Sequence, residues 1–249
     1  MSRYRATPLP TEIAARSLRV IRPRDAADLY RNPPQEFARL ARAGLLLRVA
    51  RGYYAIPPME ALGTTSWRPS AESVALAIGI VDYGKDGAAL VGISAARVLD
   101  AVPRALAVGV VAVPAERRPI DTLTGPMTFW KRDTSGLAIQ RTRTELATGW
   151  VTTPEQTILD LAYRPTLAGI SPSTTSEAMW TLATRVDWET VFDLSVHQRR
   201  RAAYTRARWT CAGLVSGDAP PAVRSRRLVS AGGLRSWRDA DPETFGIRR

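Results

Sequence analysis

The stretch from residue 32 to residue 56 has the punctuation of one helix followed by one hairpin, and it restricts the fold of the amino-terminal part more than any other feature. Asn32 can cap a helix, and Pro33-Pro34 follows at positions where a missing backbone N–H costs nothing. Gly44 can end that helix in the left-handed conformation that glycine adopts readily. The two apolar runs within 45–56 are separated by a turn that contains glycine, which predicts a β-hairpin.

Two shorter helices are expected before this unit. The apolar positions of 11–19 fit a short amphipathic helix, residues 20–22 read as extended, and residues 24–30 fit a second helix. Three helices and a β-ribbon within about 50 residues are typical of a winged helix-turn-helix. We therefore predict an α+β chain whose residues 1–57 form a winged helix-turn-helix DNA-binding domain.

The outward face of the third helix carries the candidate base-reading residues. Gln35, Arg39 and Arg42 lie at i, i+4 and i+7, opposite the apolar stripe that begins at Phe37. In a helix-turn-helix this helix enters the major groove, where Arg pairs with guanine and Gln with adenine, each good pair giving roughly 1–3 kcal/mol of discrimination. An alternative stays open, in which Arg39 pairs with Glu36 on a solvated helix and Gln35 turns back to cap the helix.

Further contacts to DNA are expected from the hairpin and from the amino terminus. Arg48 and Arg51 belong to the wing, where they would meet phosphates. Arg3 and Arg5 could form an arm that lies over the minor groove. These four arginines complete the DNA-binding surface that we predict for the first domain.

The distribution of charge favours a polyanionic partner for the first segment. The formal net charge is +12, and 33 of the 35 basic residues are Arg, an excess that a GC-rich genome alone could produce. Residues 1–57 hold 11 basic and 4 acidic residues, residues 58–165 hold 11 of each, and residues 166–249 hold 13 and 8. Because coding bias would raise the charge everywhere, a neutral middle part between basic ends indicates a nucleic-acid partner for the first segment.

Residues 58–215 are expected to form a larger mixed α/β domain with a helical carboxyl-terminal part. The run 105–113 is dense in Val and Ala and predicts a central strand, with three expected neighbours at 127–131, 137–143 and 150–152. The segment Thr153-Pro154-Glu155-Gln156 is a capping box that opens a helix, and Ser70 is expected to cap the helix that follows it. Helices are expected over five segments: 70–82, 94–100, 154–164, 176–186 and 187–214. The tail 216–249 is basic and predicts loose structure.

Two segments resemble a known protein family. Residues 40–57, which include Arg51-Gly52-Tyr53-Tyr54, resemble the amino-terminal module of the AbiEi antitoxins of type IV toxin–antitoxin systems. Residues 151–165 resemble the threonine-proline-glutamate helix start of that family, and Asp187-Trp188 resembles a further helix opening. Together these similarities extend over about residues 10–215.

The resemblance implies a function for each part of the chain. It implies a winged-helix repressor that binds inverted repeats in its own promoter as double-stranded DNA. It also implies that the larger domain neutralises a nucleotidyltransferase toxin encoded nearby. Two features depart from the family: the link Asn32-Pro33-Pro34 is shorter and stiffer than the usual turn, and the tail beyond Ser216 has no counterpart.

A second basic run lies far from the first domain. Arg199, Arg200 and Arg201 could form a second surface for a polyanion such as RNA, or for the acidic face of a partner protein. The alternative is a solvated helix face in an arginine-rich chain.

Catalysis, metals and cofactors find no support in the sequence, so we predict no catalytic residue, no metal, no cofactor and no enzyme activity. With Cys211 and His197 as the single residues of their types, no thiolate or multi-histidine metal site can be built. Neither a Walker loop nor a GxGxxG motif occurs. The longest apolar run, 105–114, is about half of what a membrane-spanning helix needs, and residues 1–10 do not resemble a leader, so we expect a cytoplasmic protein without membrane contact.

Two alternative functions remain open. The chain could be a stand-alone winged-helix transcriptional regulator that has no toxin partner. It could also be a metal-dependent nuclease, because the 11 carboxylates of residues 58–165 could form a site that spacing does not show.

Overall fold

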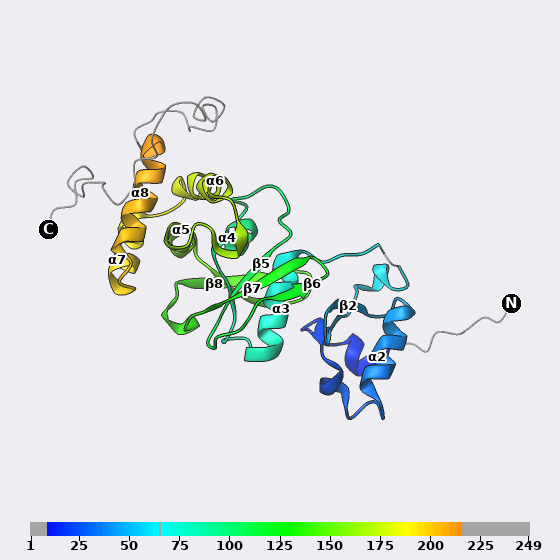
Figure 1. Cartoon of the computed structure of the whole chain (residues 1–249). Coiled ribbons are helices and arrows are strands. Elements are labelled where there is room, and N and C mark those ends of the chain that lie inside the picture. The colour runs from blue at the N-terminus through cyan, green and yellow to red at the C-terminus, as the bar shows by residue number, and fades with distance from the viewer. Residues whose placement is uncertain (1–8, 65, 216–249) are drawn as a thin grey trace.

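The computed structural model describes residues 9–64 and 66–215, whose strands form one nine-stranded sheet with helices on both faces (Figure 1). In chain order the strands are β1 (Val20–Ile21), β2 (Leu47–Ala50), β3 (Tyr53–Ala55), β4 (Ala89–Leu90), β5 (Gly109–Val113), β6 (Ile120–Thr122), β7 (Gly125–Lys131), β8 (Ile139–Arg143) and β9 (Thr148–Thr152). Along the sheet their order is β1-β3-β2-β6-β7-β5-β4-β9-β8. Parallel pairs (β5 with β7, β4 with β9) and antiparallel pairs both occur, so the fold is mixed α/β.

The α-helices of the described residues divide into an amino-terminal pair and a later group. They are α1 (Thr11–Ala14), α2 (Pro33–Arg42), α3 (Ala71–Tyr83), α4 (Gly92–Val98), α5 (Pro154–Tyr163), α6 (Pro172–Ala183), α7 (Trp188–His197) and α8 (Arg201–Val215). Short 3-10 turns are η1 (Pro23–Ala26), η2 (Met59–Ala61), η3 (Thr134–Gly136) and η4 (Leu167–Gly169). Helix α3 covers one face of the sheet, whereas α4, α5 and α6 cover the other face and α7 and α8 pack against α5 (Figure 1).

The hairpin predicted in the first segment is confirmed, and the two helices before α2 are shorter than expected. Strands β2 and β3 pair antiparallel across a turn in which Gly52 has φ +82°, and β1 pairs with β3. The helix predicted over 11–19 is the single turn α1, and the helix predicted over 24–30 is the 3-10 turn η1 followed by a turn. Helix α1 ends early because Arg19 is extended, its N–H donating to the Leu146 carbonyl and its guanidinium to the carbonyls of Ile56 and Pro57.

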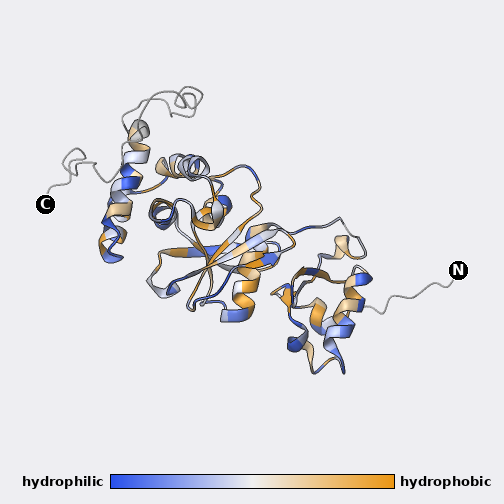
Figure 2. Cartoon of the chain, in the orientation of Figure 1, coloured by the Kyte–Doolittle hydropathy of each residue, from blue (hydrophilic) through white to orange (hydrophobic). Residues whose placement is uncertain are grey.

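Helix α3 is the central helix of the larger part, as its apolar sequence predicts. Its first ten residues are all buried, and the helix is hydrophobic over much of its length (Figure 2). The hydroxyl of Ser70 accepts the Ser73 N–H at its start, and the hydroxyl of Thr153 accepts the Gln156 N–H at the start of α5, so both predicted caps are confirmed. Apolar burial on both faces of the sheet therefore holds the larger part together.

Two predictions for the larger part are corrected. The strand expected over 105–113 begins only at Gly109, where the chain passes so close to α3 that a Cβ would lie 2.7 Å from that of Ala75. The helix expected over 187–214 is two helices, α7 and α8, because the chain turns at Arg199 with φ +54°. That turn directs Arg200 toward the buried carboxylate of Asp160.

None of the helices of the described residues is both long and apolar enough to cross a membrane. Arg3, Arg5 and the tail 216–249, for which the sequence makes predictions, lie outside the described residues.

Candidate nucleic-acid interface

Helix α2 is anchored by one apolar side and presents the other side to solvent. Phe37 and Leu40 are at most 1% exposed, and the Phe37 ring makes edge contacts with Tyr30 and Tyr54 at centroid distances of 6.2 and 5.3 Å. These contacts fix the rotation of the helix about its axis, because burying the Phe37 side requires the opposite side to face outward. The opposite side carries Gln35 and Arg42, and both are exposed.

The three candidate base-reading side chains of α2 lie on the accessible face and make local contacts. Arg39 Nε lies 2.9 Å from Glu36 Oε2, and the two side chains are 41% and 34% exposed. Arg42 Nε donates to the Ala38 carbonyl at 3.3 Å, and Gln35 accepts from Asn32 at 3.1 Å. The alternative pairing of Arg39 with Glu36 is thus present, but an exposed pair contributes only about 0.2–1 kcal/mol and can exchange for a ligand.

The arginines of the β2–β3 hairpin, which the sequence predicts to be a wing, are also accessible. Arg48 lies on β2 and Arg51 on the turn that follows it, and both are exposed. Neither forms an ion pair with another residue between 9 and 215 in the described chain. Arg48 and Arg51 therefore have guanidinium groups free to contact phosphate oxygens.

Strand β2 of the hairpin is joined to the larger part of the chain. Ala50 on β2 pairs with Thr122 on β6, and the Leu123 N–H donates to the Val49 carbonyl at 2.7 Å. Val49 and Ala55 also belong to the apolar cluster under α3. The first segment and the larger part thus share a sheet and a core.

A carboxylate at the end of α3 reinforces this junction. Asp82 lies 2.7 Å from Arg22 and pairs with Arg117, and it accepts a hydrogen bond of 2.6 Å from the Tyr53 hydroxyl. Burial and the bond to Asp82 raise the pKa of Tyr53. Arg117 also stacks on Phe129 at 4.2 Å from the ring centroid. We call Asp82, Arg22, Tyr53 and Arg117 the Asp82 junction.

Sequence reasoning missed the Asp82 junction, although one signal for it was present. Asp82 is an acid in the last turn of a helix, where the helix dipole disfavours negative charge unless cations are nearby. Such a position predicts that a basic partner from elsewhere in the chain is present. Which partner it is depends on the tertiary structure.

The basic run at 199–201 does not present its three side chains as one surface. Arg199 and Arg201 are exposed, whereas Arg200 points inward and its Nη1 donates to Asp160 Oδ1 at 3.2 Å. Arg201 lies over the Phe192 ring with its guanidinium carbon 5.8 Å from the centroid. The helix break between α7 and α8 accounts for this divergence.

Comparison with known proteins finds a family match for the first segment. Residues 9–57 match the family model described as transcriptional regulator, AbiEi antitoxin. The match covers 49 of the 249 residues, from the start of the described chain through β3, and we refer to it as the AbiEi segment. The similarity to AbiEi antitoxins read from the sequence is confirmed for this segment. No curated protein matches the chain.

The carboxylates of the described residues are dispersed. Within 9–64 and 66–215, no group of three or more His, Cys, Asp or Glu side chains lies in a position to hold a metal ion. The buried acids are instead spread over the fold, with Glu72 on α3 and Asp160 on α5.

Proposed function

We propose that this protein is a DNA-binding antitoxin regulator that represses its own toxin–antitoxin operon. The observation that carries the proposal is that the AbiEi match coincides with the segment whose α2 exposes Arg39 and Arg42. The order helix, strand, turn, helix and hairpin within this segment is compatible with a winged helix-turn-helix in which α2 enters the major groove. Gln35 reads bases beside the two arginines, and Arg48 and Arg51 contact phosphates.

We further propose that residues 58–215 neutralise a nucleotidyltransferase toxin encoded by a neighbouring gene. The support is the similarity of 151–165 to the AbiEi helix start, together with the balance of 11 basic and 11 acidic residues in 58–165. A segment without excess charge has no electrostatic attraction to DNA as a whole, which leaves it available for another partner.

DNA recognition is tested by replacing Arg39 and Arg42 together with Ala. Affinity for the protein's own promoter, measured by fluorescence anisotropy, should fall about 30-fold or more, because each bidentate arginine–guanine pair contributes roughly 1–3 kcal/mol. The matched control is Arg141→Ala with Arg143→Ala, which removes the same charge from β8 at the opposite end of the sheet. If both double variants bind the promoter equally, α2 does not read DNA.

Toxin neutralisation is tested separately by co-expression. The neighbouring gene is expressed with the wild-type chain, with the Arg39→Ala/Arg42→Ala variant, or alone, and growth is recorded. We expect both chains to restore growth, because the second function belongs to residues 58–215. Loss of protection in the DNA-binding variant would place neutralisation on the AbiEi segment, and a neighbour that is not toxic would favour a stand-alone regulator.

A further inference from the structure

A cluster of arginines and aromatic rings lies where β7, α5 and α8 meet. It consists of Trp130 and Arg132 at the end of β7, Tyr163 and Arg164 at the end of α5, and Arg200 before α8. We call these five residues the Trp130 cluster. In Figure 1 β7 runs through the middle of the sheet, whereas α5 and α8 lie on the side of the molecule away from α2, so the cluster is separate from the DNA-binding face proposed above.

The rings and guanidinium groups of the cluster are stacked closely. Trp130 and Tyr163 are nearly parallel, with an interplanar angle of 5° and centroids 6.2 Å apart. The guanidinium carbons of Arg132, Arg164 and Arg200 lie 4.7, 5.3 and 5.4 Å from the Trp130 ring centroid. Arg200 is also 4.1 Å from the Tyr163 centroid. A stacked guanidinium keeps its N–H edge available for an anion.

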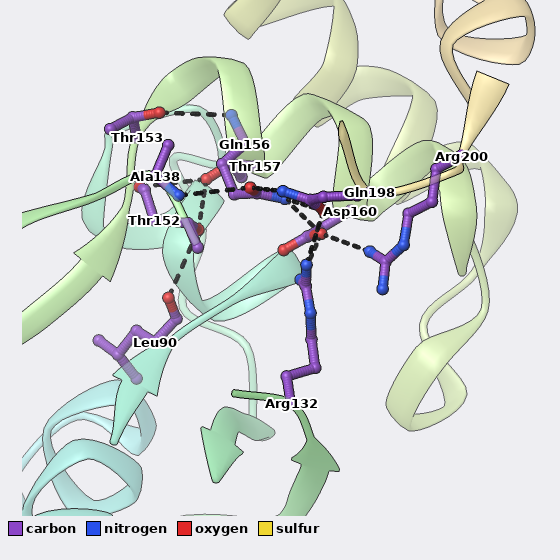
Figure 3. A network of polar contacts seen from close by, with 10 residues as sticks. All are labelled: Leu90, Arg132, Ala138, Thr152, Thr153, Gln156, Thr157, Asp160, Gln198 and Arg200. Atoms are coloured by element: carbon purple, nitrogen blue, oxygen red, sulfur yellow. Dashed lines mark hydrogen bonds and ion pairs between the residues drawn. The ribbon is translucent and has the colours of Figure 1, made fainter. Parts of the chain in front are cut away.

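The positive charge of the cluster exceeds the negative charge next to it. The carboxylate of Asp160 pairs with two arginines of the cluster. Asp160 Oδ1 accepts a hydrogen bond from Arg132 at 2.6 Å and another from Arg200 at 3.2 Å (Figure 3). Arg164 pairs with no carboxylate among the described residues. Burial and repulsion from Arg132 lower the pKa of Arg200, as expected for a cation that lacks sufficient counter-charge. Three cations therefore share one anion, and a bound anion would restore the balance.

The cluster has a rigid buried base and an accessible rim. Trp130 is 5% exposed and the Arg132 side chain 7%. Gln156 and Gln198 fix this base, since Arg132 Nη2 donates to Gln198 Oε1 at 2.9 Å and Gln156 Nε2 donates to Asp160 Oδ1 at 2.9 Å (Figure 3). Tyr163 is 44% exposed and Arg164 is also exposed, so a ligand can reach both.

We propose that the Trp130 cluster binds a nucleoside phosphate, either as a free nucleotide or as part of a single-stranded nucleic acid. Arg164 holds the phosphate through its N–H groups, the positive charge of Arg200 lies beside it, and the base stacks on the exposed Tyr163 ring. An acidic protein surface would also satisfy the arginines, whereas a nucleoside phosphate supplies both an anion for them and a flat base that stacks on the accessible ring. The combination of excess positive charge and an exposed ring is the feature that favours a nucleotide.

The experiment uses the full chain carrying Arg39→Ala and Arg42→Ala, so that the proposed operator face contributes little. Binding of a fluorescein-labelled single-stranded RNA is followed by anisotropy. Adding Arg164→Ala or Tyr163→Leu should weaken binding about tenfold, the order of magnitude of one stacking or charged contact. The matched control Arg143→Ala removes an exposed charge from β8, which contributes no residue to the cluster, and should change affinity less than about twofold.

Competitors then identify the source of the ligand. Displacement of the RNA by ATP indicates a free nucleotide, and displacement by unlabelled oligonucleotide alone indicates a strand, and either result supports the site. Inorganic phosphate should displace the RNA only weakly. Because phosphate has no base to stack on Tyr163, its competition should be the same in the Tyr163→Leu variant.

Three results would overturn the proposal: no binding of any probe, an equal decrease in affinity with Arg143→Ala, or displacement by poly-glutamate as effective as by nucleotides. Promoter binding by Arg164→Ala in an otherwise wild-type chain should be unchanged, which separates failure of this site from failure of the proposed operator recognition.

Discussion

Cys211 lies at the contact between α6 and α8, where its thiol faces the Met179 carbonyl at 3.7 Å and the residue has no exposed surface. Burial raises the pKa of this thiol to about 12. Since the thiolate is the reactive form, the residue should be inert in the folded protein. This position makes Cys211 a packing residue.

A thiol-specific reagent at pH 8 tests this directly. We expect no reaction in the native protein and one reactive thiol per chain in denaturant, because Cys211 is the single cysteine. The unfolded thiol ionises near its ordinary pKa of about 8.5 while the folded thiol stays protonated, so the free energy of unfolding should fall as the pH rises above that value. Rapid native labelling at the same pH would show that the α6–α8 contact opens.

Arg39 shows what sequence spacing can and cannot resolve at this scale. The positions of Glu36 and Arg39 allowed two outcomes, an ion pair along the helix or a free base-reading side chain. The structure has the pair at 2.9 Å, with both side chains still partly exposed. The spacing of the two residues was compatible with either outcome. Only the packing of Phe37 determined that this face of the helix is accessible.

Among the elements, the β2–β3 hairpin is expected under the proposed function to contribute to DNA affinity but not to the preference for one DNA sequence over another. Replacing Arg48 and Arg51 by Ala removes two exposed cations and no packing. Promoter DNA and unrelated DNA should both bind more weakly. The slope of log K against log salt should become shallower by about 2, because each phosphate that is no longer neutralised changes it by roughly 0.9. Anisotropy titrations across a range of salt concentrations measure the slope.

A matched comparison is the Arg39→Ala/Arg42→Ala variant, which should lose mainly the preference for the promoter. If the wing variant instead loses promoter affinity and retains affinity for unrelated DNA, β2 and β3 contact bases rather than phosphates.

Elements with strong local signals were predicted well. Ser70 and Thr153 cap their helices as expected, and Gly52 occupies the hairpin turn with positive φ. Strands β4 and β6, of two and three residues, were not predicted, because their hydrogen bonds are made entirely to other strands of the sheet. A strand this short has no pattern of its own.

At the scale of the whole molecule, the Asp82 junction should couple the stability of the AbiEi segment to that of the larger part. Asp82→Asn removes a charge shared by Arg22 and Arg117; Arg22 keeps its ion pair with Asp25, whereas Arg117 is left facing a neutral amide. Breaking a largely buried pair costs about 3–5 kcal/mol, and we expect the lower end because the Asp82 side chain keeps 11% exposure. Chemical denaturation measures the decrease in stability, and limited proteolysis at exposed Met59 should become faster.

The control for this variant is Glu177→Gln, which breaks the half-exposed pair with Arg104 and should cost less than about 1 kcal/mol. Equal stability of Asp82→Asn and wild type would show that the two parts are held by the sheet and the core alone.

Residue patterns alone were sufficient for the local features with strong signals: the starts of α3 and α5, the hairpin turn at Gly52, and the similarity of the first segment to AbiEi antitoxins. These features depend on backbone geometry and on side chains close in sequence, which a pattern of residues encodes directly.

Which segments pair with one another, and which side chains face solvent, follow only from the tertiary structure. The pairing of Ala50 with Thr122, the contacts of Asp82, and the gathering of Arg132, Arg164 and Arg200 around Trp130 bring together residues that are far apart in the chain. Such contacts form because burial of apolar surface on both faces of the sheet selects one arrangement, and no local spacing contains that information.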